Sequence, residues 1–411
     1  MLRTFCCIRL VIATALAVSI TSSNALAAFA SDDPIKIGFI TSLTGAAAPG
    51  GNDMLNGIKL YMDEIHNEMA GRKVQLVIEN DGSSPATAAA GITKLANEDK
   101  CDILDGILLV NCSYAAAKAA EVAATPFLGA VASGDDLTQR LHYKWFLRSG
   151  YASSQPMQPF GDWVYKTLKY KRVITFAMDY GFGYETVGGF QKSFEQAGGK
   201  VVQKIWAPLG FRDFSTFIKS MHKDADAVFM CNVGSAAFLV PQQYKEMGPG
   251  LPIIGNGTTA DESTLEKAGD ELIGATTALI YCPSLDTRAN KQFVRTYTAK
   301  YQKQPSYYAE CAYTSGMWIG KAVESLNGNV EDKEKVLAAL KSVQLKDAPR
   351  GPMTLDDRGN PIENIYVRRV VKIHDRLENK VIETFPHVSQ FWKWSEDEYL
   401  KRPPYSKDYP Q

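Results

Sequence analysis

The 411-residue sequence lacks the motifs that most often indicate catalysis. There is no G-x-S-x-G, which argues against a nucleophile elbow, and no C-x-x-C, which argues against a zinc ribbon or a dithiol redox site. The histidines are scattered, with no H-E-x-x-H, at His66, His142, His222, His374 and His387. These absences favour a ligand-binding function over an enzymatic one, so we expect no catalytic residue and no metal site.

Cofactor motifs are also missing. The glycine-containing loop Ser42–Gly51 has no G-x-x-x-x-G-K-[ST], so a phosphate cradle is not expected there. Residues 255–260, GNGTTA, match the loose form G-x-G-x-x-A after a strand. No acidic residue ends the following strand, where recognition of a ribose would need one. The sequence therefore predicts no cofactor.

The chain has no excess of charge of one sign. Lysine and arginine total 45, as do aspartate and glutamate, so the formal net charge is zero. Without a basic field there is little attraction for a polyanion, which argues against nucleic acid as a partner. A small ligand is still compatible with this balance.

Cysteine is scarce, and its spacing gives no disulfide framework. Cys6 and Cys7 lie near the start of the chain, and five cysteines follow, at Cys101, Cys112, Cys231, Cys282 and Cys311. Because five is odd, at least one thiol is free or pairs between chains. Their apolar neighbours predict that most of them are buried as small hydrophobic side chains.

The first thirty residues have the pattern of a secretory signal peptide. Two arginines are followed by the apolar run Leu10–Ile20 and by an A-x-A cleavage site at residues 25–27. The run is too short to span ~30 Å of hydrocarbon, and no later stretch is apolar enough to do so. We expect cleavage near Ala27 or Ala30 and export to the periplasm.

Strand and helix patterns alternate along the rest of the chain. Apolar runs typical of buried parallel strands occur at residues 35–40, 74–80, 103–110, 125–131, 172–178, 227–233 and 251–255. Between the first two, Met54, Ile58, Tyr61 and Ile65 form one stripe of a helix. The alternation predicts α/β architecture, with parallel-rich sheets covered by helices on both faces.

The β-α units form two series, which predicts two lobes. One series runs from residue 34 to about 148, and a second opens near residue 171. Residues 364–373 read as a late strand that must join one of the two sheets. The aromatic and proline-rich end of the chain, from residue 391, is expected to wrap the surface as a coil.

An ordered set of short motifs resembles one known family. Residues 35–81 contain an S-L-T-G loop, a D-E-I run and a G-R-K turn before Asp81, and later matches include DYGFG, PSYYAECAY and RGPMTLDDRGNP. Together they cover nearly all of the expected mature chain. The sequence is similar to substrate-binding proteins of ABC transporters of the branched-chain amino-acid type (Leu/Ile/Val-binding-like), which are type I periplasmic binding proteins.

The resemblance implies two Rossmann-like lobes joined by three hinge crossovers, near 147–151, 279–284 and 350–356. It divides the chain into a signal peptide (1–30), lobe 1 (31–148 plus 284–352), lobe 2 (149–283 plus 353–385) and a C-terminal tail (386–411). It also implies a monomer without catalytic residue or cofactor. Such a protein closes on a small ligand in the cleft and delivers it to a membrane ABC permease.

The resemblance also identifies residues for a ligand carboxylate. In relatives that bind amino acids, hydroxyls and backbone N–H groups hold this group, and the matching positions are Ser113, Ala132 and Ser133. A helix N-terminus with nearby hydroxyls suits an anion, although both serines could equally cap helices. The loop Ser42–Gly51 is expected to form one wall of the cleft.

The ammonium site departs from the family pattern. Where amino-acid binders have an acidic residue, this chain has Asn256 in one loop and Tyr151 with small residues in another. A buried ammonium without a counter-charge is costly, so an α-amino acid fits poorly. Gly50, where many relatives have an aromatic residue, leaves space for a bulkier ligand.

Aromatic side chains are candidates for the other wall of the cleft, at Tyr151, Phe182, Tyr184 and Phe238, with Phe182 favoured. The sequence therefore predicts uptake of an organic acid, possibly an aromatic one. Branched-chain or other amino acids, amides and urea are alternatives within the family. An exported hydrolase and a sensor ectodomain are alternatives from other classes. The scattered histidines oppose the hydrolase, and the sensor would need a transmembrane helix or a signalling domain, which we do not expect in this sequence.

Overall fold

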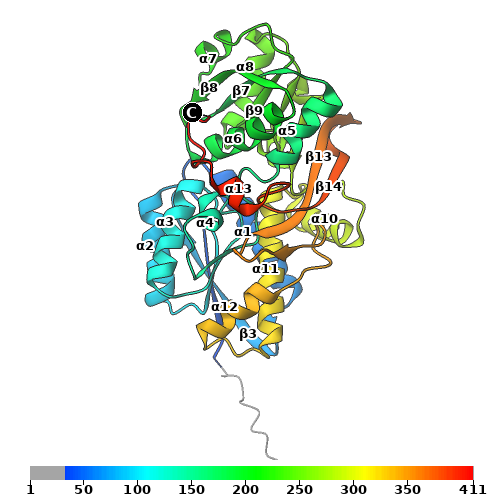
Figure 1. Cartoon of the computed structure of the whole chain (residues 1–411). Helices are drawn as coiled ribbons and strands as arrows, with labels where there is room; N and C mark the ends of the chain where they lie inside the picture. The colour runs from blue at the N-terminus through cyan, green and yellow to red at the C-terminus, as the bar shows by residue number, and fades with distance from the viewer. Residues whose placement is uncertain (1–32, 411) are drawn as a thin grey trace, which may run out of the picture.

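The computed structural model describes residues 33–410, which form two α/β lobes stacked end to end (Figure 1). The expected signal peptide, residues 1–30, lies outside the described residues. Within residues 33–410, no helix combines the length and the apolarity needed to cross a membrane. The five cysteines of this part of the chain are all buried and free, as their apolar neighbours predicted.

The lower lobe is built on a six-stranded sheet of order β2-β3-β1-β4-β5-β6. Its strands are β1 (Ile35–Thr41), β2 (Glu68–Met69), β3 (Arg72–Asn80), β4 (Ile103–Gly106), β5 (Phe127–Gly129) and β6 (Phe146–Arg148). All neighbours are parallel except β2 and β3. Ile37 of β1 lies between Leu76 and Ile103, so the apolar runs meet in register.

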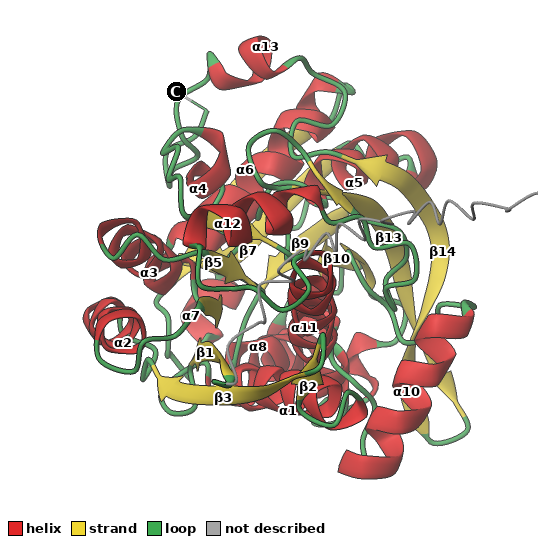
Figure 2. Cartoon of the chain, turned by 90° about the horizontal axis from the view of Figure 1, so that it is seen from below, coloured by secondary structure: helices red, strands yellow, loops and turns green. Residues whose placement is uncertain are grey.

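Helices cover both faces of this sheet. They are α1 (Ala48–Glu64), α2 (Pro85–Asn97), α3 (Val110–Val122), α4 (Asp136–Gln139), α10 (Arg288–Tyr301), α11 (Tyr307–Ser325) and α12 (Lys333–Ser342). The helix α1 packs against α11 and α2 packs against α3. Right-handed crossovers place these two pairs on opposite faces, and Figure 2 shows the helices surrounding the strands.

The upper lobe is built on an eight-stranded sheet of order β12-β13-β11-β10-β9-β7-β8, with β14 paired to β13. Its strands are β7 (Arg172–Met178), β8 (Lys200–Ala207), β9 (Ala227–Cys231), β10 (Ile253–Asn256), β11 (Thr276–Leu279), β12 (Thr354–Leu355), β13 (Pro361–Ile373) and β14 (Arg376–Val388). Its helices include α5 (Met157–Trp163), α6 (Gly181–Gln196), α7 (Ser215–Lys219), α8 (Ala236–Met247) and α9 (Glu262–Leu265). The predicted α/β class with parallel-rich sheets is confirmed.

Two details of the expected elements differ from the structure. The run 103–110 is a strand only to Gly106, because Ile107 has a positive φ of 62° and α3 begins at Val110. Its remaining apolar residues are buried at the junction of the lobes rather than in the sheet. The late strand forms β13, which pairs antiparallel with β11, as expected of a strand that joins one of the sheets.

The end of the chain is coil for most of its length, as expected, but the expectation that it lies only on the surface is wrong. The strand β14 continues to Val388, past the expected start of the tail at 386, and the short helix α13 (Glu396–Leu400) follows. Four aromatic side chains of this segment are buried, Phe391, Trp394, Tyr399 and Tyr405. Burial of this much apolar surface is what fixes the segment against the lobes.

This segment, residues 389–410, contacts both lobes and is here named the C-terminal clasp (Figure 1). On the upper lobe, the Tyr399 hydroxyl accepts a hydrogen bond of 2.7 Å from Nε2 of Gln158. On the lower lobe, Thr138 of α4 donates to Oε1 of Gln390 at 2.9 Å, and Arg402 donates to Oε1 of Gln139 at 3.1 Å.

Three fully buried arginines lie at the three places where the chain passes between the sheets. Arg148, at the end of β6, donates to the carbonyl oxygen of Tyr151 at 2.8 Å. Arg368 of β13 donates to the carbonyl oxygen of Tyr281, just after β11, at 2.9 Å. Each guanidinium thus satisfies a backbone acceptor that a chain crossing leaves without a strand partner.

Arg350 joins two of these crossings. Its Nη1 lies 3.2 Å from the carbonyl oxygen of Ser149 and 3.3 Å from Oε2 of Glu363 in β13. Its Nε donates to Oε2 of Glu310 in α11 at 2.8 Å. All three charged side chains are at most 1% exposed. The ion pairs between them offset the free-energy cost of burying these charges.

Replacing Arg350 with methionine removes the cation and leaves Glu310 and Glu363 buried without it. We expect Arg350→Met to lower the free energy of unfolding by about 3–5 kcal/mol, the usual cost of breaking a buried ion pair. Urea denaturation measures this change. Arg369→Met, which removes an exposed arginine of β13, is the control, and an equal loss in both variants would contradict the role given to Arg350.

Asp105, in β4, is another buried acid of the lower lobe. Its Oδ1 accepts hydrogen bonds from the Ser315 hydroxyl and from the backbone N–H of Gly106, the latter at 2.7 Å. Within the described residues its Oδ2 has no hydrogen-bond partner. Burial raises the pKa of Asp105 from 3.8 to about 7, and the two hydrogen bonds only partly oppose this shift.

This raised pKa makes stability depend on pH. Above pH 3.8 the unfolded chain releases the Asp105 proton, while the folded chain keeps it until about pH 7. The free energy of unfolding contributed by this group therefore falls as the pH rises through that window. We expect Asp105→Asn to flatten the pH dependence of urea unfolding between those values, and an unchanged slope would contradict this assignment.

Candidate functional site

Two adjacent chambers between the lobes, here together called the cavity, share the lining residues Leu108, Leu109, Val233 and Tyr308. The Ser133 chamber is further lined by Val110, Val131, Ser133, Tyr180, Phe182 and Tyr307. The Lys267 chamber is further lined by Ala46, Ala47, Pro49, Gly50, Leu209, Gly234, Phe238, Thr258, Ser263, Thr264 and Lys267.

The lining residues follow the carboxyl ends of parallel strands. Leu108 comes shortly after β4, Ser133 after β5 and Tyr180 after β7. Val233 follows β9 and Thr258 follows β10 in the same way. The cavity therefore lies where open α/β sheets usually bind ligands, because the loops there are free of sheet hydrogen bonding.

Helix N-termini converge on the two chambers. The first turns of α3 and α6 contribute Val110 and Phe182 to the Ser133 chamber, and those of α1 and α8 contribute Gly50 and Phe238 to the Lys267 chamber. In the described structure none of these helices has a side-chain cap on its first turn. Two other helices at the cavity are capped, α11 by Ser306 and α9 by Asp261.

Helix N-termini present N–H groups and a partial positive charge to the cavity. The Lys267 chamber receives fewer free donors, because the Ala48 N–H of α1 donates to Gly45, Pro49 has no N–H, and the Ala237 N–H of α8 donates to Gly234. Among the described residues that line it there is no aspartate or glutamate, and Lys267 is the one charged side chain. Nζ of Lys267 lies 5.7 Å from the centre of the Phe238 ring. The cavity therefore favours an anion and offers no counter-charge to an ammonium group.

The structure brings some of the predicted site residues to this cavity. Ser133 and Phe182 line the Ser133 chamber. The loop wall predicted at residues 42–51 contributes Ala46, Ala47, Pro49 and Gly50 to the Lys267 chamber, together with the predicted aromatic residue Phe238. The structure contains no ligand, so their contacts with one remain predictions.

Ser113 and Ala132 are placed differently. The Ser113 hydroxyl donates to the carbonyl oxygen of Val110 at 2.7 Å, inside the first turn of α3. The backbone N–H of Ala132 donates to the carbonyl oxygen of Ile107 at 3.1 Å. Neither is among the described lining residues, and both polar groups are already paired. A direct ligand contact at these two positions stays a prediction.

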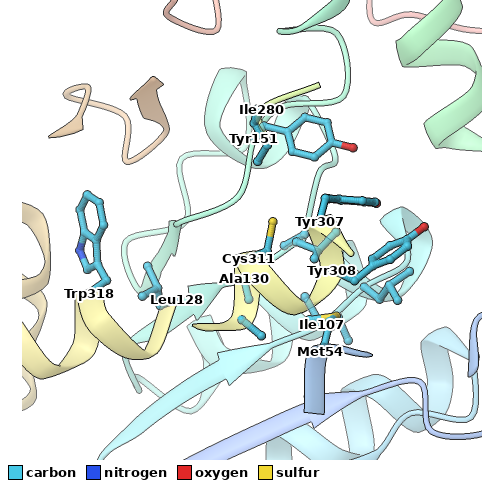
Figure 3. Close-up of a cluster of buried hydrophobic side chains, with 14 of the residues drawn as sticks. Met54, Ile107, Leu128, Ala130, Tyr151, Ile280, Tyr307, Tyr308, Cys311 and Trp318 are labelled. Carbon is cyan, nitrogen blue, oxygen red and sulfur yellow. The ribbon is translucent and has the colours of Figure 1, made fainter. Parts of the chain in front are cut away.

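Tyr151 and Asn256 lie behind the lining. The Tyr151 ring is fully buried, 6.3 Å from the ring of Tyr307 between centroids, and its hydroxyl has no hydrogen-bond partner in the described part of the chain (Figure 3). Oδ1 of Asn256 accepts a hydrogen bond of 2.9 Å from the backbone N–H of Thr258. Asn256 therefore positions a lining residue by fixing the turn after β10.

Several lining residues were not predicted. Tyr307 and Tyr308 project from the start of α11, beside Met54 of α1 (Figure 3), and their ring centroids are 4.0 Å apart. The run Ser306-Tyr307-Tyr308 after a proline does indicate a helix N-terminus, but nothing in it indicates a cleft. Lys267 follows a short helix in an irregular region and carries no motif of its own.

A direct hydrogen bond joins the two lobes beside the cavity. The Tyr114 hydroxyl, from α3, donates to Oε1 of Glu185 in α6 at 3.0 Å. It also accepts from the backbone N–H of Asp136 at 3.1 Å. Burial raises the pKa of Glu185 well above its ordinary value. This carboxyl is thus engaged by Tyr114, and it does not supply a free anion to the cavity.

Comparison with known proteins identifies the family. The model of the family described as periplasmic binding protein matches residues 34–375. The chain belongs to the periplasmic binding protein family. It is of the type I, branched-chain amino-acid ABC class. Leu/Ile/Val-binding protein homolog 6 from Brucella abortus is 29% identical over 381 residues, which are 90% of this chain and 95% of that protein.

Two solved structures of periplasmic binding proteins share the arrangement of both lobes. An ABC transporter substrate-binding protein from Sphaerobacter thermophilus is 30% identical, with a TM-score of 0.82 over 87% of this chain and 99% of that one. A solute-binding protein from Rhodopseudomonas palustris BisB5, in complex with 3,4-dihydroxy benzoic acid, is 28% identical, with a TM-score of 0.83 over 88% and 99% of the two chains.

This periplasmic binding protein is therefore an extracytoplasmic solute-binding protein of an ABC transporter. Proteins of this kind bind a small ligand and deliver it to a membrane permease. They are transport components and not a class of enzyme. The three hinge crossovers implied by the resemblance correspond to the chain passages after β6, after β11 and before β13.

Proposed function

We propose that this protein binds an aromatic carboxylate in the cavity between its lobes and supplies it to an ABC permease. It acts as a periplasmic monomer after removal of residues 1–30. The lobes that close on the ligand are residues 31–148 plus 284–352 and residues 149–283 plus 353–385.

The observation that carries this proposal is the convergence of uncapped helix N-termini on a cavity lined by no acidic side chain among the described residues. In the Ser133 chamber the first turns of α3 and α6 offer backbone N–H groups from opposite lobes. The hydroxyl of Ser133 adds a neutral donor beside them. A carboxylate satisfies these donors without bringing a second charge into the site.

The walls suit a flat ring. Phe182, Tyr307 and Tyr308 line the Ser133 chamber, and the apolar side chains of Leu108 and Val233 border both chambers. Aromatic side chains stack on an aromatic ligand and exclude water from it, which adds affinity beyond the carboxylate contact. The related protein from R. palustris that holds 3,4-dihydroxy benzoic acid has the same fold, which supports this choice.

An amino acid is the second candidate, because the curated relative from B. abortus is named a Leu/Ile/Val-binding protein homolog. Its ammonium group would enter a site whose described lining has no carboxylate and whose one charged side chain is the cation Lys267. Desolvating an unpaired ammonium costs several kcal/mol, so the cavity disfavours this ligand.

Isothermal titration calorimetry of the mature protein tests the proposal. The titrants are leucine, benzoate, 4-hydroxybenzoate and cinnamate, a phenylpropenoic acid. We expect heat from at least one aromatic acid and none from leucine, because the donors suit a carboxylate and no group pairs with an ammonium. Tight binding of leucine with no heat from the aromatic acids would overturn the proposal.

Ser133→Ala tests the position of the carboxylate. Loss of one hydroxyl donor should weaken an aromatic acid by about 1–3 kcal/mol, the usual cost of an unpaired buried acceptor. The same titration measures it, and unchanged affinity would remove Ser133 from the site. The parallel variant Ser113→Ala is the comparison, because its hydroxyl is bonded inside α3 and its removal should change affinity less.

A further inference from the structure

We propose that the ligand carries an anionic group at each end, as an aromatic dicarboxylate does, with the second carboxylate in the Lys267 chamber. This inference rests on the proposed function and names the substrate class more narrowly. It places the first carboxylate in the Ser133 chamber and the ring between the two chambers.

Both chambers lie at helix N-termini, with fewer free N–H groups at the Lys267 chamber. Each receives the uncapped first turns of one helix from either lobe, α3 and α6 in the Ser133 chamber and α1 and α8 in the Lys267 chamber. The residues common to both chambers, Leu108, Leu109, Val233 and Tyr308, are mainly apolar. The two ends of the cavity therefore favour hydrogen-bond acceptors of a ligand, and its apolar middle does not.

An independent observation points to a ligand group in the Lys267 chamber. Thr258 is 2% exposed and lines this chamber, and within the described chain its Oγ1 has no hydrogen-bond partner. The turn that presents it is fixed by Asn256, which accepts from its backbone N–H. The neighbouring Ser263 hydroxyl is already bonded to Oδ2 of Asp261 at 2.7 Å, so Thr258 is the available donor.

Charge distinguishes the two chambers and selects a second anion over a neutral group. Lys267, an exposed side chain, brings a positive charge to the Lys267 chamber, whose described lining includes no acid. A benzoate in the Ser133 chamber would leave both Lys267 and Thr258 without a ligand acceptor. A carboxylate opposite the first one, across a ring, would pair with both.

Position 50 brings α1 close to two residues that both chambers share. A Cβ added at Gly50 would lie 3.0 Å from Cδ1 of Leu108 and 3.2 Å from ring carbons of Tyr308. Glycine at this position therefore lets α1 pack closely against these two side chains.

The test compares two ligands that differ only at the far end of the ring. Benzoate and benzene-1,4-dicarboxylate are titrated into the mature protein and into Lys267→Met by calorimetry. Lys245→Met, which removes an exposed lysine of α8 outside the cavity lining, is the control for loss of one surface charge. Thr258→Val removes the unpartnered hydroxyl with little change of shape.

We expect the dicarboxylate to bind at least about tenfold more tightly than benzoate, a difference of roughly 1.4 kcal/mol. Lys267→Met and Thr258→Val should reduce this preference and leave the affinity for benzoate within about twofold, since each acts on the second carboxylate. Lys245→Met should change neither.

Benzoate binding without a gain for the dicarboxylate would overturn this inference and leave the proposed function standing. A preference for 4-hydroxybenzoate over the dicarboxylate would likewise overturn it, because the Lys267 chamber would then hold a neutral phenol. An equal loss for both ligands in Lys267→Met would also contradict it. Binding of no aromatic acid at all would overturn the proposed function and this inference together.

Discussion

The structure depends on guanidinium groups that hold the places where the chain passes between its lobes. A crossing segment leaves its sheet, so its carbonyl groups lose their strand partners while remaining buried. Arg148, Arg350 and Arg368 donate to these carbonyls from three different parts of the sequence. Arginine suits this task because it keeps its charge when buried and has five donors in a rigid plane. The lobes can close on a cavity because this junction is fixed.

The cavity above that junction takes its polarity from the backbone rather than from ionised side chains. Helix N-termini point into both chambers, and the described lining residues include one lysine and no acid. A backbone donor cannot move away or lose its proton, so such a site prefers acceptors over a wide range of pH. Two acids beside the cavity are already bonded, Glu185 to the Tyr114 hydroxyl and Asp261 to the Ser263 hydroxyl and the backbone N–H of Tyr307, and they contribute to the contact between lobes instead. Selectivity for an anion thus follows from where strands end and helices begin.

Most of the fold could be predicted from local patterns, because buried parallel strands are continuous apolar runs and their helices carry one apolar stripe. The run 35–40 became β1, and residues 364–373 became part of β13. Ser133 and Phe182 could be assigned to the cavity because each follows the end of a strand in the sequence. Tyr307, Tyr308 and Lys267 could not be assigned this way, since their place depends on helices that return to the cleft from distant parts of the sequence. The clasp was missed because its aromatic residues have no periodicity, and only burial against both lobes fixes them.

The C-terminal clasp also bears on the energetics of opening. Residues 389–410 form hydrogen bonds to α4 of the lower lobe through Gln390 and Arg402, and to α5 of the upper lobe through Tyr399. Rotation of one lobe away from the other must strain or release one of these attachments. The clasp therefore opposes large rotations of the two lobes away from each other. An empty protein held near its closed shape loses less conformational entropy on capture, and its cargo is bound more tightly for the same set of contacts.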